Sequence, residues 1–270
     1  MSIKVGIIGT GNMGGALIKG LCSSIREYEI YAYDLNTQIT EQLAKQYSIN
    51  IMPSVQELSK QCDVVVVAVK PHHMENVLKE CKKTLSKNTV FVSVAVGLTI
   101  EYYTKILGED KKIVRTMPNI AALVREGVTI VSFGDNVTSD EKKLVMDIFS
   151  CVGYAEELDE SLMCQVTALT SSSPAYIFMM IEAMADAAVQ SGIPRNVSYR
   201  LAAQAVSGSA RMVLETQKHP AELKDMVCSP AGTTINAVYA LEEKGFRSVI
   251  MTAMKECTGR AIEISRGMDK

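Results

Sequence analysis

The fold is decided by KVGIIGTGNMGGALIKGL, residues 4–21. Its apolar run Lys4–Ile8 is typical of a buried strand, and Asn12–Leu21 has the periodicity of a helix. Between them stands Gly9-Thr10-Gly11-Asn12-Met13-Gly14, which is G-x-G-x-x-G in the strand-turn-helix context that binds a dinucleotide. Gly9 permits the tight turn, Gly11 lets the backbone approach a pyrophosphate, and Gly14 lets the helix pack on the strand. We predict that Gly9, Thr10, Gly11, Asn12 and Met13 bind the cofactor, the alternative being a turn that serves packing alone.

Short β-rich runs alternate with helix-length segments from this loop to Glu157. The expected strands are Lys4–Ile8, Glu29–Tyr33, Asp63–Val69, Thr89–Val94, Lys112–Arg115, Val128–Phe133 and Tyr154–Glu157, and the expected helices between them include Asn12–Leu21, Gln38–Gln46 and Pro71–Lys82. This alternation predicts the α/β class, with an N-terminal Rossmann-type, doubly wound and mainly parallel sheet. The run DVVVVAV at 63–69 is apolar on both faces, which predicts a central strand covered by helices on each side.

The strand signal stops after about residue 160. A long helical pattern follows, interrupted at Ser171–Pro174, and further helices are expected at Val197–Thr216, Pro220–Met226, Ile235–Lys244 and Phe246–Ser265. We therefore predict a C-terminal all-helical domain. The expected boundaries are 1–158 for the dinucleotide-binding domain and 159–270 for the helical domain.

The composition of the chain indicates which classes of binding partner to expect. The chain has 270 residues, is 47% hydrophobic and 21% charged, and carries a formal net charge of −2. The sequence has no long basic run, so neither nucleic acid nor an anionic membrane is expected as a partner. It also has no run of eighteen consecutive apolar residues, so no membrane-spanning helix is expected. Seven scattered cysteines without a C-x-x-C pair fit neither a disulfide framework nor a zinc site. We expect buried thiols, no metal, a cytoplasmic location and a small-molecule substrate.

Two further segments follow predicted strand ends, where open α/β sheets bind ligands. Asp34 ends the second strand and could accept hydrogen bonds from an adenosine ribose, or it could cap the next helix. Its charge would repel a 2′-phosphate, which favours NADH. Lys70 and Pro71 follow the buried strand, where Lys70 brings a cation to the crevice. The segment RTMPN at 115–119 is expected to line the same crevice.

The helical half carries two polar segments. TSSSPAY at 170–176 either caps the helix that resumes there or faces a ligand with its hydroxyls. SPAGTT at 229–234 leads into a helix, so that a threonine could be its N-cap. The backbone N–H groups of Gly232, Thr233 and Thr234 would also make a seat for a carboxylate at the positive end of that helix. The histidines at 72, 73 and 219 form no triad or metal pattern, and surface or capping roles are expected for them.

These motifs together resemble the pyrroline-5-carboxylate reductase family across nearly the whole chain. The matching elements are IGTGNMG at 8–14, AVKP at 68–71, MPN at 117–119, SSPAY at 172–176, HPAELKDMVCSPAGTTI at 219–235 and LEEKGFR at 241–247. Four positions depart from the family pattern. Ser171 and Ala231 stand where glycine is usual, and Ile120 with Ala121 stands where Thr-Pro is usual.

The resemblance implies reduction of 1-pyrroline-5-carboxylate to L-proline, by a hydride from NADPH or NADH. It implies that Thr234 is catalytic, through a hydrogen bond to the imine nitrogen, and that the substrate site consists of Ser172, Pro174, Ser229, Ala231, Gly232, Thr233 and Thr234. The loop at 229–234 would reach that site from a partner subunit in an interlocked homodimer, and such dimers often form decamers.

The resemblance also extends the cofactor site. AVKP adds Ala68 and Val69 beside Lys70 and Pro71. Because the family commonly works with NADPH, Asn36 and Thr37 would hold a 2′-phosphate while Asp34 turns aside. Two alternatives stay open: a reductase of the 3-hydroxy acid dehydrogenase type, with Lys224 as its catalytic lysine, or a non-catalytic NAD(P)-binding sensor.

Overall fold

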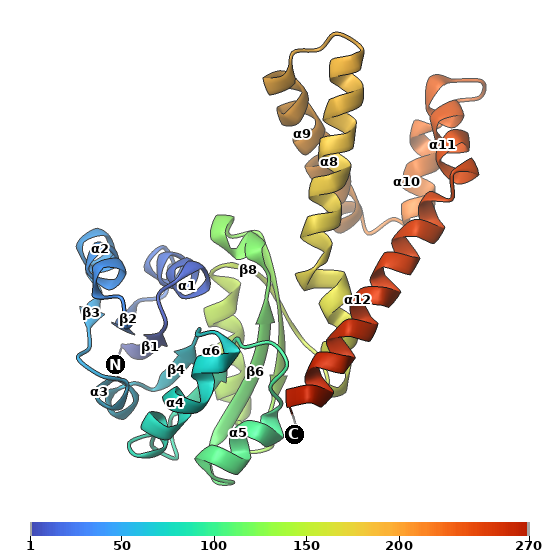
Figure 1. Cartoon of the computed structure of the whole chain (residues 1–270). Coiled ribbons are helices and arrows are strands. Elements are labelled where there is room, and N and C mark those ends of the chain that lie inside the picture. The colour runs from blue at the N-terminus through green and yellow to red at the C-terminus, as the bar shows by residue number, and fades with distance from the viewer. Residues whose placement is uncertain (1, 269–270) are drawn as a thin grey trace. The chain divides into compact units, whose positions relative to one another are not determined.

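The computed structural model describes residues 2–268 (Figure 1). The chain forms two compact units, one of Met1–Ser172 with Cys257–Lys270 and one of Ser173–Glu256. We call them the α/β unit and the helical unit.

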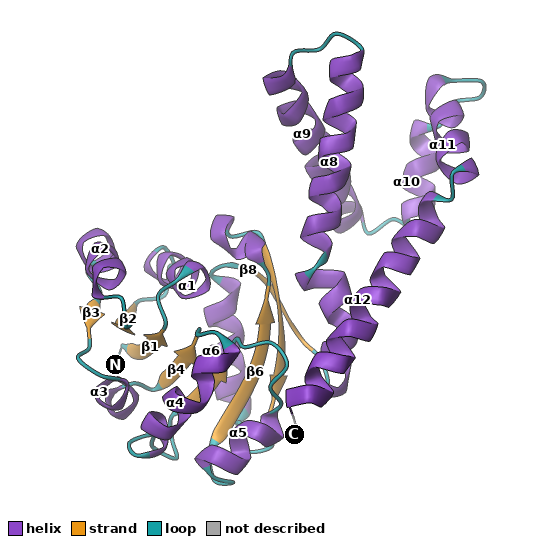
Figure 2. Cartoon of the chain, viewed as in Figure 1, coloured by secondary structure: helices purple, strands orange, loops and turns teal. Residues whose placement is uncertain are grey.

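The α/β unit is built on a single sheet, whose strands are drawn in orange in Figure 2. The strands are β1 (Ile3–Ile8), β2 (Tyr28–Tyr33), β3 (Asn50–Ile51), β4 (Val64–Val67), β5 (Val90–Ser93), β6 (Lys112–Pro118), β7 (Gly127–Phe133) and β8 (Gly153–Glu157). The helices are α1 (Asn12–Cys22), α2 (Thr37–Tyr47), α3 (Val55–Gln61), α4 (Pro71–Lys82), α5 (Ile100–Leu107), α6 (Ser139–Ser150) and α7 (Met163–Val166). Three short turns complete it: the 3-10 helices η1 (Ile120–Val124) and η2 (Glu160–Leu162) and the π-helix η3 (Thr167–Ser171).

The sheet order is β3-β2-β1-β4-β5-β6-β7-β8. Neighbouring strands run parallel except β6 and β7, which are antiparallel. The predicted α/β class and mainly parallel Rossmann-type sheet are confirmed. In this order β1 lies between β2 and β4, and the register pairs Ile8 with Tyr33 and with Val67. The carboxyl ends of β1, β2 and β4 therefore lie together at the topological switch point, where such sheets bind ligands.

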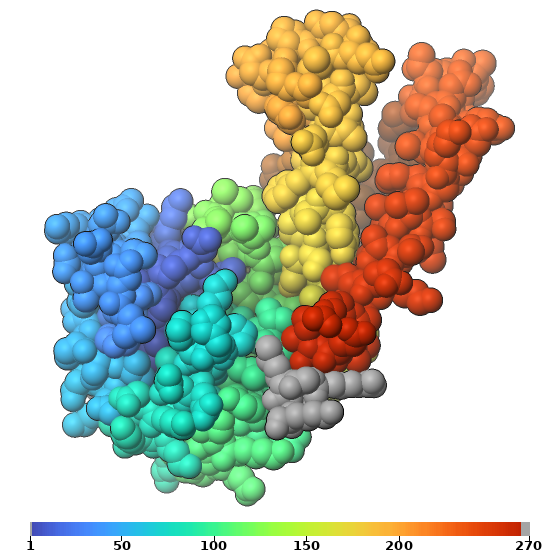
Figure 3. All heavy atoms as spheres, viewed as in Figure 1, coloured from blue at the N-terminus to red at the C-terminus, as the bar shows by residue number. Residues whose placement is uncertain are grey.

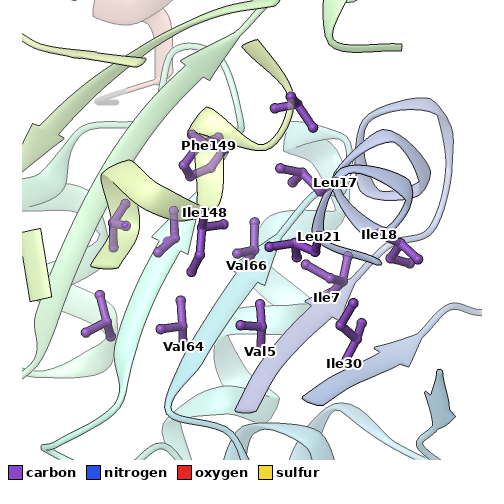
Figure 4. Packing of buried hydrophobic residues seen from close by; sticks show 14 of the residues in the cluster. Val5, Ile7, Leu17, Ile18, Leu21, Ile30, Val64, Val66, Ile148 and Phe149 are labelled. Carbon is purple, nitrogen blue, oxygen red and sulfur yellow. The ribbon is translucent and has the colours of Figure 1, made fainter. Parts of the chain in front are cut away.

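The central strand β4 explains why both faces of the sheet are covered. Val64 and Val66 pack with Leu17 of α1 and Phe149 of α6 on one face (Figure 4). Val65 and Val67 pack on the opposite face, in a second cluster with Leu58, Met74 and Leu78. All four valines are fully buried, and burial of a valine side chain stabilises a fold by roughly 1.5–3 kcal/mol. The predicted central strand, apolar on both faces, is confirmed.

Some elements differ from the sequence prediction. β3 has only two residues and pairs with Tyr31 and Ala32, so it is too short to show a period of its own. β6 runs on to Pro118 because antiparallel pairing with β7 extends it. α11 begins at Thr233, two residues before the expected start.

The helical unit contains α8 (Ser173–Gln190), α9 (Arg195–Thr216), α10 (Pro220–Val227), α11 (Thr233–Glu243) and most of α12 (Phe246–Met268). α9 packs against both α8 and α10. Large apolar side chains are exposed on these helices in the single chain, among them Phe178, Met179, Leu201, Leu214, Val227 and Tyr239. Figure 3 draws the atoms of α8 in yellow and those of α12 in red. An exposed apolar surface of this extent is typical of a protein interface.

Candidate active site

The loop after β1 has the conformation that its glycines predict. Gly9 adopts φ +90, and a Cβ there would lie 2.7 Å from the carbonyl oxygen of Ala68. A Cβ on Gly14 would lie 1.9 Å from the carbonyl oxygen of Gly9, so no other residue lets α1 pack this closely. At Gly11 an added Cβ would meet nothing within 4 Å. The space above Gly11 is open, and its backbone faces that space.

The N-terminus of α1 supplies backbone N–H groups that can donate hydrogen bonds to an anion. Gly11 is the N-cap, and glycine has no side chain with which to cap the first turn. The first N–H groups of a helix have no partner within the helix, and they carry its positive dipole end. Free N–H groups beside an open space fit a pyrophosphate, so this loop can hold the dinucleotide that the sequence predicts.

Asp34 joins the loops after β1 and β2. Its Oδ2 accepts from the Thr10 N–H at 2.6 Å and from the Thr10 hydroxyl at 3.1 Å. Its Oδ1 accepts from the Asn36 N–H at 2.9 Å. The N-cap of α2 is Asn36, so the expectation that Asp34 caps this helix is wrong. The carboxylate turns toward Thr10, and its negative charge is shared among three protein donors.

The segment after β4 reaches the same edge of the sheet. The Ala68 N–H donates to the carbonyl of Ile8 at 2.7 Å, which holds the loop against β1. Lys70 is the exposed N-cap of α4, and Pro71 is its first residue, a position where proline needs no N–H.

A cavity of about 580 Å³ lies at this edge. Of the predicted cofactor residues it is lined by Gly9, Gly11, Asp34, Asn36, Ala68, Val69 and Lys70, while Thr10, Asn12, Met13 and Pro71 are not among its lining residues. Sequence reasoning missed Leu35, Val55, His73, Asn76 and Val77, which also line it. Leu35, Val55 and Val77 give it an apolar wall suited to an adenine ring. Their helical or loop positions carried no signal, and His73 was expected to have only a surface or capping role.

The segment RTMPN is not part of this cavity lining. Arg115 points into the unit, where its guanidinium donates to Glu160 Oε1 at 3.0 Å and its side chain is only 4% exposed. The same carboxylate oxygen accepts from the Ile100 N–H at 2.8 Å. Arg115 therefore has a structural role, and the expectation that it lines the crevice is wrong.

The segment at 229–234 forms a tight turn before α11. The Gly232 N–H donates to the carbonyl of Ser229 at 3.1 Å, Pro230 is the second residue of the turn, and Ala231 is the third. Ala231 has φ 56, the left-handed conformation that the third residue of a type II turn requires. Gly232 is the N-cap, so neither threonine caps α11. Thr233 and Thr234 lie in the first turn, and their N–H groups are free of intrahelical partners.

The segment TSSSPAY begins with the last two residues of the π-helix η3, which are followed by a bend at Ser172 and the start of α8 at Ser173. The Ser172 hydroxyl accepts from the Cys257 thiol at 3.2 Å. Pro174 is the second residue of α8. The predicted substrate residues thus fall into two groups, one at 172–174 and one at 229–234.

The cysteines are not uniformly buried. Cys62 and Cys81 are buried, four others are half-buried, and Cys22 is exposed, which corrects the expectation of buried thiols throughout. Within the described part of the chain, no group of three or more His, Cys, Asp or Glu side chains is placed to hold a metal ion. None of the helices described between residues 2 and 268 is both long enough and apolar enough to cross a bilayer.

Comparison with known proteins places this geometry in a family. The curated pyrroline-5-carboxylate reductase of Escherichia coli (strain K12) is 46% identical over 98% of this chain and 100% of its own length. The chain belongs to the pyrroline-5-carboxylate reductase family. That membership confirms the predicted family and makes the chain an NAD(P)H-dependent oxidoreductase.

Two family models and two solved structures support the same family. A family model described as pyrroline-5-carboxylate reductase dimerisation matches residues 160–264, and one described as NADP oxidoreductase, coenzyme F420-dependent, matches residues 4–97. A pyrroline-5-carboxylate reductase structure from Coxiella burnetii has a TM-score of 0.92 at 32% identity, covering 98% of this chain and 99% of that chain. The Plasmodium falciparum pyrroline carboxylate reductase with NADP bound has a TM-score of 0.85 at 34% identity, covering 97% and 98%.

The structure accounts for one departure from the pyrroline-5-carboxylate reductase pattern. At Ala231, the left-handed φ is the reason why glycine is favoured there, and alanine holds it at some conformational cost. At Ser171 the added hydroxyl is buried and, among the described residues, has no hydrogen-bond partner. Ile120 and Ala121 lie in η1, and nothing in the structure explains their difference from the family pattern.

Proposed function

We propose that the chain reduces 1-pyrroline-5-carboxylate to L-proline with NADPH or NADH, the last step of proline biosynthesis. The observation that carries the proposal is the likeness to pyrroline-5-carboxylate reductases over 98% of the chain. This likeness spans both the glycine-rich loop and the turn at 229–234.

The cofactor supplies the hydride when bound. On the protein side, the open backbone at Gly11 and the first turn of α1 would hold the pyrophosphate. Leu35 and Val77 would pack against the adenine, and Lys70 would bring a positive charge to the crevice. The residues proposed to bind cofactor are Gly9, Thr10, Gly11, Asn12, Met13, Asp34, Asn36, Ala68, Val69, Lys70 and Pro71. Of these, Thr10 acts through its bond to Asp34.

The turn at 229–234 would bind the substrate. The N–H groups of Thr233 and Thr234, in the first turn of α11, would bind the substrate carboxylate at the positive end of that helix. The Gly232 N–H, also predicted to take part, is instead bonded to the carbonyl of Ser229 within the turn. The Thr234 hydroxyl would then lie beside the ring nitrogen. A protonated imine is already electrophilic, so the hydride can add to its carbon without a strong acid among the side chains. Thr234 would orient the ring and relay a proton to the nitrogen. Ser172, Pro174, Ser229 and Ala231 complete the proposed substrate site.

We also propose that the chain forms a homo-oligomer. The C-terminal match to a dimerisation model and the exposed apolar side chains of α8 to α12 support a homo-oligomer. In the homodimer, residues 159–270 would bind substrate and dimerise while residues 1–158 bind cofactor. We further propose that the dimers assemble into a decamer and that the protein is cytoplasmic.

Cofactor turnover under three conditions tests the function. Purified chain with NADPH or NADH is given 1-pyrroline-5-carboxylate or no substrate, and in the third reaction the chain with NADP+ or NAD+ is given a 3-hydroxy acid. Rapid oxidation with the first compound alone supports the proposal. Activity with the 3-hydroxy acid would favour the dehydrogenase alternative, for which Lys224 on α10 would have to leave its ion pair with Asp225. Cofactor binding without turnover would favour a sensor.

A further inference from the structure

A proline near the start of α8 leaves a buried carbonyl without its normal partner. In an α-helix the N–H of each residue donates to the carbonyl four residues earlier. Pro174 has no N–H, so the carbonyl of Thr170 would be unpaired if the helix ran through this segment. Thr170 is only 9% exposed, and a buried carbonyl is normally paired.

Asn119, the last residue of MPN, supplies that partner. Its Nδ2 donates to the carbonyl of Thr170 at 2.9 Å, and its Oδ1 accepts from the Val128 N–H at 3.1 Å. Its own N–H donates to the carbonyl of Val128 at 3.1 Å. Asn119 is 8% exposed and both ends of its amide are used. An amide can donate at one end and accept at the other, which a carboxylate cannot do at neutral pH.

The bond holds the chain in an unusual geometry. Residues Thr167–Ser171 form the π-helix η3, closed by the Ser172 N–H, which donates to the carbonyl of Thr167 at 3.0 Å. The Thr167 hydroxyl donates to the carbonyl of Met163 at 2.8 Å. π-Helical turns are rare, and they occur often at functional sites. Here the turn ends at Ser172, whose hydroxyl accepts from the Cys257 thiol.

We propose that Asn119 is a positioning residue for the substrate. It captures the carbonyl that Pro174 leaves free, fixes the π-turn, and thereby sets the direction in which Ser172 meets the cyclic imino acid. The inference rests on the proposed function, because that function places Ser172 at the substrate. It assigns to MPN a role in shaping the substrate site rather than in lining the cofactor crevice.

The test separates KM for substrate from KM for cofactor. Asn119→Ala should raise KM for 1-pyrroline-5-carboxylate by about tenfold, while KM for NADPH stays within about threefold of the wild type. Binding of 2′,5′-ADP, measured by calorimetry, should not change. Asn136→Ala is the matched control: its Nδ2 also donates to backbone carbonyls, those of Glu109 and Lys111, elsewhere in the same unit. This control should leave both KM values unchanged.

A second variant keeps the test decisive if alanine unfolds the chain. Asn119→Asp has nearly the same volume and still accepts from Val128, but it can donate to Thr170 only when protonated. Its KM for substrate, divided by the wild-type value at the same pH, should therefore fall as the pH is lowered. A merely structural asparagine would change the melting temperature and leave this ratio flat.

The outcomes are distinct. Wild-type turnover with an unchanged substrate KM in Asn119→Ala, or a flat pH ratio in Asn119→Asp, overturns the positioning role alone. Equal rises in the two KM values would also overturn it, because they would indicate a change that is not confined to the substrate site. Failure of the wild type to turn over 1-pyrroline-5-carboxylate overturns the proposed function and this inference with it.

Discussion

The carboxylate of Asp34 lies against the backbone of Thr10, with Oδ2 at 2.6 Å from the Thr10 nitrogen. The contact joins the glycine-rich loop after β1 to the turn after β2. Thr40 extends the link, since its hydroxyl lies 3.3 Å from that of Thr10 and both residues are buried. In this arrangement Asp34 shapes the loop, and its charge is partly neutralised by the donors around it.

Replacement of Asp34 tests which of its contacts governs cofactor choice. Asp34→Ser should lower kcat/KM for NADPH and for NADH together, by about tenfold, since loss of a hydrogen bond to a charged group costs roughly 1.5–3 kcal/mol. The ratio between the two cofactors should change by less than about threefold. Steady-state kinetics with both cofactors measures this. Asp63→Ser is the control, because Asp63 likewise accepts a backbone N–H, that of Lys4, before β4 begins.

A large change of that ratio would contradict the assignment. If Asp34→Ser shifts the ratio about tenfold or more toward NADPH, Asp34 faces the ribose directly and repels the 2′-phosphate by its charge.

The close contact between Gly232 and Ser229 provides a test of the turn at 229–234. A Cβ there would lie 2.2 Å from the Ser229 hydroxyl and 3.1 Å from the Ser229 carbonyl oxygen. Gly232→Ala should therefore lower the melting temperature and raise KM for substrate. Adding Ser229→Ala removes the closer clash, so the double variant should recover its melting temperature while KM stays high. If KM recovers as well, the turn does not seat the substrate carboxylate.

Thr234 is not the N-cap of α11, so its replacement should not remove a cap. Thr234→Ala should lower kcat/KM by roughly 10- to 100-fold, the range expected for loss of one hydrogen bond to a charged group. Thr234→Ser should recover most of the loss, and the melting temperature should not change in either variant. Thr216→Ala, at the end of α9, serves as a control for a lost helical hydroxyl. Full activity in Thr234→Ala would remove Thr234 from the mechanism.

Two buried thiols predict a pH effect on stability. Burial raises the pKa of Cys62 and of Cys81 from 9.0 to about 12. Because the folded state favours the protonated thiol, this contribution is fully present below about pH 9 and is lost as the pH rises toward 12. The urea concentration at the midpoint of unfolding should therefore fall between pH 9 and pH 12. It should fall less in the double variant that carries both Cys62→Ala and Cys81→Ala.

The burial of these two thiols also predicts their reactivity. Iodoacetamide should modify Cys22 in the folded protein and Cys62 or Cys81 only after unfolding. Rapid labelling of the last two in the folded state would contradict their burial.

Much of the α/β unit could be predicted because periodicity and glycine geometry act locally. The run at Val64–Val67 and the loop Gly9–Gly14 each contain the physical reason for their structure. Arg115 was misplaced because a strand end looks the same in sequence whether its side chain faces a crevice or an ion pair with Glu160. The partnership of Asn119 with Thr170 could not be predicted, since 51 residues separate them and only the folded sheet brings them together.

The substrate site was predicted mainly through the resemblance. Pattern alone left SPAGTT as a cap or an anion seat, because both need free N–H groups at a helix start. The structure distinguishes the cap, Gly232, from the threonines that follow it. Leu35 and Val77 of the cofactor cavity lacked any signal, since an apolar residue in a loop or on a helix indicates packing before it indicates an adenine.

Transfer of deuterium from cofactor to product tests the central claim most directly. The purified chain is incubated with 1-pyrroline-5-carboxylate and NADPH or NADH that carries deuterium at both C4 positions of the nicotinamide ring, and the product is analysed by mass spectrometry and NMR. The account predicts L-proline with a single deuterium on the carbon that formed the C=N bond. Cofactor oxidation without labelled proline, or no oxidation of either cofactor in the presence of this substrate, would contradict it.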